Sequence, residues 1–403
     1  MQLMKFNDLK KIFFQVINYS VTKGLELVIS MLIILHVSMH VSPEELSILS
    51  AILLFVTYSS FANLGINSAL LKFTSKYCRH TQRFQKQHSL ATIFQASIIL
   101  GVSIFSQEQS LGFLLSFHFI RQAILAKLRV DGNIRMLSSY NAFYVLNFSI
   151  LYYLLILKTD YISALKISWI FASLTVIIPY SISHLSDFKC EEKLFDLYPL
   201  KLLFKYGPGL MVFNLGLTIS LSLHKLLLNF VLDDKNIIGL YQFADQLSSI
   251  PYIASLTVSF IAIKPLITLL SKGKLSIASL LSYSLIFLAI VSIFTIFFYH
   301  ASILLIENYT QKYLLSIAIL PGLLFHKLIL IMNVPMSAIS MAFNLESKLN
   351  KILFYLIVPS GVLQLLTLKY IDDSQLYIPY ISSFFTVVSF GIFVKYALSL
   401  ERR

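Results

Sequence analysis

Charged residues are scarce in this 403-residue chain, at 13% of the sequence, whereas soluble domains carry about a quarter. Hydrophobic residues make up 57%, and the mean hydropathy is +0.78. Apolar runs such as 276–298 are long, and crossing a hydrocarbon core of about 30 Å takes roughly 20 apolar residues in a helix. These features exclude a soluble protein and predict an integral membrane protein.

Several kinds of site are missing from the sequence. The only two cysteines, Cys78 and Cys190, are far apart and offer no disulfide framework or metal motif. There is no paired-carboxylate motif, phosphate loop or nucleophile elbow. We therefore expect no enzyme activity, no cofactor and no metal. Without an ATP site, uphill transport would have to use an ion gradient or consumption of the substrate on the far side.

The hydrophobic pattern predicts an all-α polytopic protein with about twelve transmembrane helices. We expect them at 12–37, 45–70, 88–106, 109–130, 135–157, 160–184, 203–232, 236–262, 275–300, 312–336, 349–369 and 376–398. A mixed-charge connector near 185–202 divides them into two six-helix bundles, residues 1–190 and 191–403. Each half opens alike, which is typical of transporters built from parallel repeats.

The connecting loops alternate in charge. Most of the 32 Lys and Arg residues fall in one set of loops and at both termini, whereas the opposite set holds only Lys158, Lys235, Lys312 and Lys369. Because short basic loops stay in the cytoplasm, both termini are predicted to be cytoplasmic. The net charge of +13 therefore indicates membrane orientation and no nucleic-acid partner. Ser42 to Glu45 in a short acidic outer loop predicts a capping box.

Ionisable residues inside spans are costly and usually face a bundle interior or a cavity. Seven ionisable residues are singled out inside the predicted spans: Lys23, Glu26, Arg121, Lys166, Lys225, Asp245 and Lys327. Five of them are basic, and this excess favours an anionic ligand. For some of them a purely structural role remains open. Lys166 can snorkel outward, and Lys23 and Glu26 can pair within one helix. Lys225 can snorkel or can line a cavity in a polar stripe with Asn214.

Arg121 is the strongest candidate for binding, because its planar fork can grip a phosphate in a bidentate manner. His118 and Gln122 lie beside it at helical spacing. Lys327 lies next to His326, beyond Pro321, which we expect to break that helix. Asp245 shares a helix face with Tyr241, Ser248 and Tyr252. Asp245 and Glu26 are candidates for ion coupling, although Asp245 can equally neutralise a nearby lysine.

Four short segments carry a resemblance to a known family: SPEEL (42–46), NLGINSALLKF (63–73), KYGPGLMVFNLG (205–216) and NIIGLYQFADQLSSIP (236–251). With its length and helix number, the chain resembles the O-antigen flippases. These are the Wzx-type polysaccharide-unit translocases of the multidrug/oligosaccharidyl-lipid/polysaccharide (MOP) exporter superfamily. Members often have an acidic residue before the basic one that ends helix seven, where this chain has His224-Lys225.

The resemblance implies a MATE-like transporter with two bundles in a V around a cationic cavity. Located in the bacterial inner membrane, it would flip oligosaccharide units on undecaprenyl pyrophosphate, coupled to protons or sodium. An O-antigen polymerase and a chain-length regulator are candidate partners, besides the membrane lipids. Alternatives are a multidrug/cation antiporter, which would need an acidic cavity, and a peptidoglycan-precursor flippase, which typically has two further helices. A glycan polymerase fits poorly, because the outer loops are short.

Overall fold

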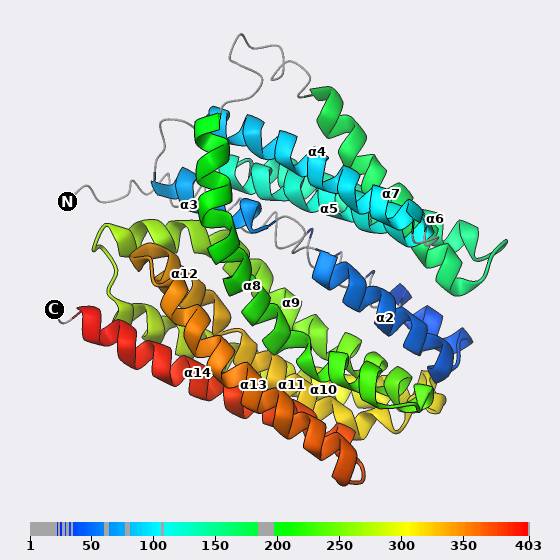
Figure 1. Cartoon of the computed structure of the whole chain (residues 1–403). Coiled ribbons are helices and arrows are strands. Elements are labelled where there is room, and N and C mark those ends of the chain that lie inside the picture. The colour runs from blue at the N-terminus through cyan, green and yellow to red at the C-terminus, as the bar shows by residue number, and fades with distance from the viewer. Residues whose placement is uncertain are drawn as a thin grey trace. The chain divides into compact units, whose positions relative to one another are not determined.

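The computed structural model describes residues 22, 25, 29, 32–33, 35–59, 64–76, 81–105, 109–183 and 197–401. Every regular element in these ranges is a helix, and they contain no strand (Figure 1). The predicted all-α fold class is therefore confirmed. Lys23 and Glu26 lie outside the described residues.

The chain forms two compact units. Unit 1 comprises Met1–Ser30 and Tyr58–Pro208. Its helix α6 packs along α7, and α5 packs against α3, α4 and α7. The helices are α3 (Ile66–Lys76), α4 (Thr81–Phe105), α5 (Gln109–Asp131), α6 (Ile134–Leu155) and α7 (Tyr161–Ser183).

Unit 2 comprises Met31–Thr57 and Gly209–Arg403, so the division falls within the last turn of α2 and within α8 (Leu197–Val231). Within the unit, α9 packs against α11 and α12, and α14 packs against α11 and α13. The other helices are α2 (Pro43–Ser59), α9 (Lys235–Ser271), α10 (Ile277–Tyr309), α11 (Ser316–Leu330), α12 (Asn333–Phe343), α13 (Glu346–Tyr370) and α14 (Ile378–Glu401), with short 3₁₀ turns η4 (Gln311–Tyr313) and η5 (Ser374–Leu376). The predicted bundles, 1–190 and 191–403, stay a prediction.

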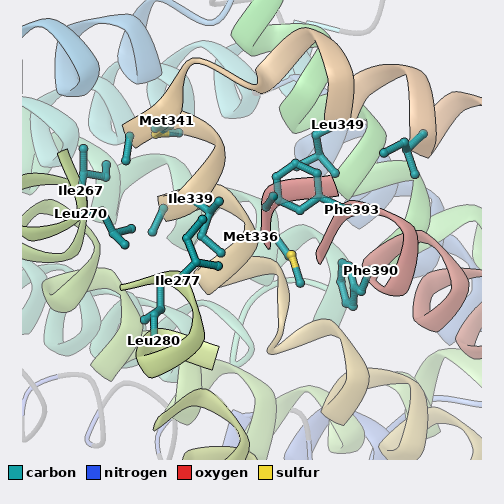
Figure 2. Close-up of a cluster of buried hydrophobic side chains, with 14 of the residues drawn as sticks. Ile267, Leu270, Ile277, Leu280, Met336, Ile339, Met341, Leu349, Phe390 and Phe393 are labelled. Atoms are coloured by element: carbon teal, nitrogen blue, oxygen red, sulfur yellow. The ribbon is translucent and has the colours of Figure 1, made fainter. Parts of the chain in front are cut away.

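A hydrophobic core joins one end of five helices in unit 2 (Figure 2). Ile267 and Leu270 end α9, Ile277 begins α10, and Leu349 begins α13. Met336 and Ile339 of α12 and Phe390 and Phe393 of α14 complete it. These are the ends next to the predicted cytoplasmic loops, so this packing fits helices that alternate in direction.

Seven helical segments of the described residues are long and apolar enough to cross a membrane. They are Phe84–Ile104, Gln109–Asp131, Tyr161–Ser183, Ile277–Tyr309, Ser316–Phe343, Glu346–Tyr370 and Ser374–Ser399. The remaining predicted crossings, and the cytoplasmic location of both termini, stay predictions.

Two predicted spans are not single helices. The span 45–70 is wrong as one helix, because Leu64 (φ 51°) and Gly65 (φ 74°) are left-handed between α2 and α3. The span 312–336 is divided at Ile331–Met332, where α11 ends, and the second helix, α12, extends to Phe343. Pro335 explains this break, since it lacks an N–H and its ring crowds the carbonyl of Ile331. The expected break at Pro321 is wrong, because Pro321 lies inside α11.

The start of α2 is the predicted capping box. The Glu45 carboxylate accepts from the Ser42 N–H at 2.7 Å, and the Ser42 hydroxyl accepts from the Glu45 N–H at 3.2 Å. The backbone of α9 approaches this turn so closely that a Cβ on Gly239 would lie 1.7 Å from the Pro43 carbonyl oxygen. Only glycine fits at this position, which is part of the quoted segment 236–251.

Gly239→Ala is expected to destabilise the protein by about 1–3 kcal/mol, because backbone atoms of α2 and α9 must move apart. Gly101→Ala is the matched control, since a Cβ added there would have nothing within 4 Å. The control should be neutral or stabilising by up to about 1 kcal/mol. Thermal unfolding of the purified protein in detergent measures both, and equal melting temperatures for the two variants would contradict the close approach.

Candidate functional site

A buried carboxylate lies at the centre of unit 2. Asp245 is on α9, and the same face carries Tyr241, Ser248 and Tyr252, as the sequence predicts. All four residues are buried. The hydroxyl of Ser248 donates to the backbone carbonyl of Asp245 at 2.9 Å, so the carboxylate itself is left to groups from other helices.

Two lysines from different helices share this carboxylate. Lys225 of α8 pairs with Oδ2 of Asp245, and Nζ of Lys327 of α11 lies 3.0 Å from Oδ1. The Lys225 side chain is 15% exposed, against 6% for Lys327 and 3% for Asp245. Lys225 is therefore the cation of this group that a ligand can reach most easily. Nζ of Lys327 also lies 5.7 Å from the ring centroid of Tyr252.

Two histidines extend this group, which we call the Asp245 cluster (His224, Lys225, Asp245, His326 and Lys327). Nε2 of His224 lies 3.9 Å from Oδ1 of Asp245. The rings of His224 and His326 meet edge to face, with centroids 5.2 Å apart. Nε2 of His326 lies 3.1 Å from the Ser220 carbonyl oxygen, and Nδ1 lies 3.3 Å from the Ser383 hydroxyl. Both histidines are fully buried.

A second cation is buried in unit 1. Arg121 of α5 is 6% exposed, and its guanidinium carbon lies 3.7 Å from the ring centroid of Tyr144 on α6. Among the described residues no carboxylate pairs with it, and its Nε has no hydrogen-bond partner. His118 lies one turn away and packs edge to face against Trp169 of α7, with centroids 5.8 Å apart. Gln122 contacts the His118 ring at 3.4 Å.

The structure thus gathers Lys225, Asp245, Tyr241, His326 and Lys327 around one point, and Arg121, His118 and Gln122 around another. Tyr241 lies against His224, with ring centroids 5.6 Å apart. Lys166 is on α7 and half-buried. The side chain of Asn214 lies outside the described residues, as do Lys23 and Glu26.

The sequence reasoning missed several contributors. His224 was noted as the neighbour of Lys225 and as a departure from the family pattern, and was not proposed as a site residue; Ser220, Ser383, Tyr144 and Trp169 carried no signal of their own. One signal was present: the dipeptide His-Lys occurs at 224–225 and again at 326–327. Both copies reach Asp245 or the ring next to it.

The chemistry of the Asp245 cluster follows from its charges. Each oxygen of the carboxylate already faces an ammonium group, and a low-dielectric site strengthens such attractions. No group of three or more His, Cys, Asp or Glu side chains in the described part of the chain is arranged to hold a metal ion. The cluster can therefore hold an anion or exchange a proton.

No protein-family model and no curated protein sequence matches the chain. Solved structures do match: the crystal structure of the eukaryotic MATE transporter AtDTX14 is 12% identical, with a TM-score of 0.70, and 97% of each chain is covered. A MATE crystal structure in the straight conformation is 9% identical with a TM-score of 0.68, covering 97% of this chain and 96% of that one. A point mutant of the Vibrio cholerae MATE transporter VcmN is 13% identical with a TM-score of 0.62, covering 97% of this chain and 98% of that one. The chain has the MATE transporter fold.

Asp245→Asn is expected to destabilise the protein by about 3–5 kcal/mol, because it leaves two buried ammonium groups without a counter-charge. The control replaces all three charges with apolar side chains of similar volume, in the triple variant Lys225→Met, Asp245→Leu and Lys327→Met. Replacing a whole buried ion group in this way is often neutral. Thermal unfolding should rank the triple variant above Asp245→Asn, and the reverse order would contradict the shared-carboxylate arrangement.

Proposed function

We propose that this protein is a flippase of the bacterial inner membrane. It moves O-antigen oligosaccharide units on undecaprenyl pyrophosphate from the cytoplasmic to the periplasmic leaflet by alternating access. The observation that carries the proposal is the excess of buried cations on apolar helices: two lysines share a single carboxylate in unit 2, and Arg121 in unit 1 pairs with none among the described residues.

The charge of the Asp245 cluster suits an anionic headgroup. Lys225 and Lys327 are positive and Asp245 is negative, so the cluster has one uncompensated positive charge while both histidines are neutral. A charge buried in an apolar medium is expensive unless it is paired. A phosphate oxygen at Lys225, the most exposed of the three, would supply the missing negative charge.

Arg121 suits the same chemistry for a geometric reason. The guanidinium carbon lies over the Tyr144 ring, and such cation–π contact stabilises a desolvated cation by about 2 kcal/mol. Among the described residues its Nε–H has no hydrogen-bond partner. A fork of this kind binds phosphate through two parallel hydrogen bonds.

The proposed function also includes the path of the prenyl tail, the energy source and the partner proteins. The prenyl tail stays in the lipid while the headgroup crosses, and a proton or cation gradient drives the cycle. An O-antigen polymerase and a chain-length regulator would take the product on the far side. A peptidoglycan-precursor flippase would need the same anion site, so the Asp245 cluster and Arg121 suit the peptidoglycan precursor as well as the O-antigen unit.

Arg121→Gln and Lys225→Gln should each lower surface O-antigen by about tenfold or more, since one charge-assisted hydrogen bond contributes roughly 1.5–3 kcal/mol. The variants are expressed in a strain that lacks the gene, and lipopolysaccharide ladders are compared at equal protein level. Lys166→Gln is the matched control, because this lysine is half-buried and belongs neither to the Asp245 cluster nor to the surroundings of Arg121. This variant should restore the ladder fully. Full restoration by Arg121→Gln would remove the role given to Arg121.

A multidrug antiporter is the second candidate, because the similar solved structures include an outward-facing multidrug-resistance MATE transporter of the MOP superfamily. Cationic drugs require acidic cavity residues, and the one carboxylate of the Asp245 cluster is already paired with two lysines. We expect ethidium efflux in a pump-deficient strain to stay at the empty-vector rate. Robust efflux with an unchanged glycan ladder would reverse the ranking of the two functions.

A further inference from the structure

We propose that His326 is the proton-binding group of unit 2, and that it takes up one proton when a phosphate-bearing anion binds at Lys225 and Lys327. The identity of the anion as a lipid headgroup rests on the proposed function. The proton site itself rests on the hydrogen bonds of the His326 ring.

One nitrogen of the ring has a fixed role. Nε2 of His326 lies 3.1 Å from the carbonyl oxygen of Ser220, and a carbonyl oxygen can only accept a hydrogen bond. Nε2 therefore carries a hydrogen in every protonation state, and the variable proton must be on Nδ1.

The partner of Nδ1 can serve both states. The Ser383 hydroxyl lies 3.3 Å from Nδ1 and 2.7 Å from the Pro379 carbonyl oxygen. When the ring is neutral, this hydroxyl can donate to Nδ1. When the ring is charged, Nδ1–H donates to the Ser383 oxygen, and the hydroxyl donates to Pro379. Rotation of one hydroxyl thus satisfies His326 before and after protonation, which a buried group needs because unpaired polar atoms are costly.

The charges facing His326 explain why an anion would trigger the uptake. The ring of His224 of α8 packs against the His326 ring, and Lys327 is the next residue of α11. Asp245 of α9 lies close to His224 and to Lys327. Lys225 of α8 acts through Asp245. With both lysines charged, a third cation is disfavoured. An anion at the lysines reverses this balance, and Asp245 can then stabilise the imidazolium instead.

A small pocket shares one residue, Ser220, with the surroundings of the His326 ring. Hydroxyl groups from α8, α13 and α14 line this pocket, and Ser220, whose carbonyl holds His326, is one of the lining residues. The hydroxyls of Ser220, Thr386 and Ser389 donate to carbonyls of their own helices. Their oxygens keep a lone pair that can accept from water, and the pocket has room for about one water molecule.

The same geometry argues against a metal cation at this point. Both oxygens of Asp245 face lysine ammonium groups, and sodium would have to displace one of them. Hard cations prefer oxygen ligands, so the imidazole nitrogens of the cluster suit a proton better than sodium.

The test reads the protonation of His326 directly by ¹⁵N nuclear magnetic resonance. The full-length protein, labelled at histidine, is placed in phosphatidylcholine nanodiscs at pH 7, and His326→Gln identifies the His326 signals. Three samples are compared: no added anion, inorganic pyrophosphate, and undecaprenyl pyrophosphate in the bilayer. The fraction of His326 rings protonated at both nitrogens should rise by about threefold or more with each anion, whereas exposed His300 should not change.

Two sets of variants separate the trigger from the switch. Lys225→Gln with Lys327→Gln should abolish the anion-induced rise. Ser383→Ala should reduce it, and Ser383→Thr should restore it, because threonine returns the hydroxyl. An unchanged His326 signal in a correctly folded protein, or a full response in Ser383→Ala, would overturn the proposal.

The outcomes keep this inference apart from the flippase proposal. A response to pyrophosphate but not to the prenyl lipid would support the proton site and overturn its link to a lipid headgroup. A normal response to both anions, together with unchanged surface glycan on deletion of the gene, would leave the proton site standing and refute the flippase function.

Discussion

The carboxylate of Asp245 is the constraint on which the centre of unit 2 depends, because among the described residues it is the one carboxylate that counterbalances lysines from two other helices. The helices α8, α9 and α11 meet there through charged side chains, next to a small apolar cluster that includes Tyr252 and Leu330, and a larger apolar core lies at the ends of α9, α10, α12, α13 and α14. Taking such charges out of water costs several kcal/mol per ion, which the mutual attraction repays only with good geometry. The residual positive charge is the charge that the proposed anion would neutralise.

The two units keep their cations by different means. In unit 1 an aromatic ring covers one face of Arg121, whereas in unit 2 a carboxylate divides its charge between two ammonium groups. Neither arrangement neutralises the cations fully. In the proposed function, both leave donors for the phosphate groups of the substrate, and in unit 2 the histidine pair next to the lysines would supply a group that changes its charge.

Local features of the fold could be predicted from the sequence. Ser42 and Glu45 form the expected capping box, and Asp245 shares a buried face with Tyr241 and Tyr252, since both follow from helical spacing alone. The sequence left open that Asp245 neutralises a nearby lysine, but it could not show which lysines do so, because a single sequence does not report contacts between distant segments. The helix breaks were also hard to place. Pro321 is accommodated in α11 while Pro335 ends it, and the left-handed Leu64 is not a residue type that marks a turn.

The most direct test of the central claim is binding of the anionic lipid to the purified protein, measured by native mass spectrometry as the fraction of protein that retains undecaprenyl pyrophosphate over phosphatidylcholine. The account predicts selective retention by the wild-type protein, and loss of that selectivity in the double variant Lys225→Gln and Lys327→Gln. Equal retention of both lipids by the wild type, or unchanged selectivity in the double variant, would contradict it.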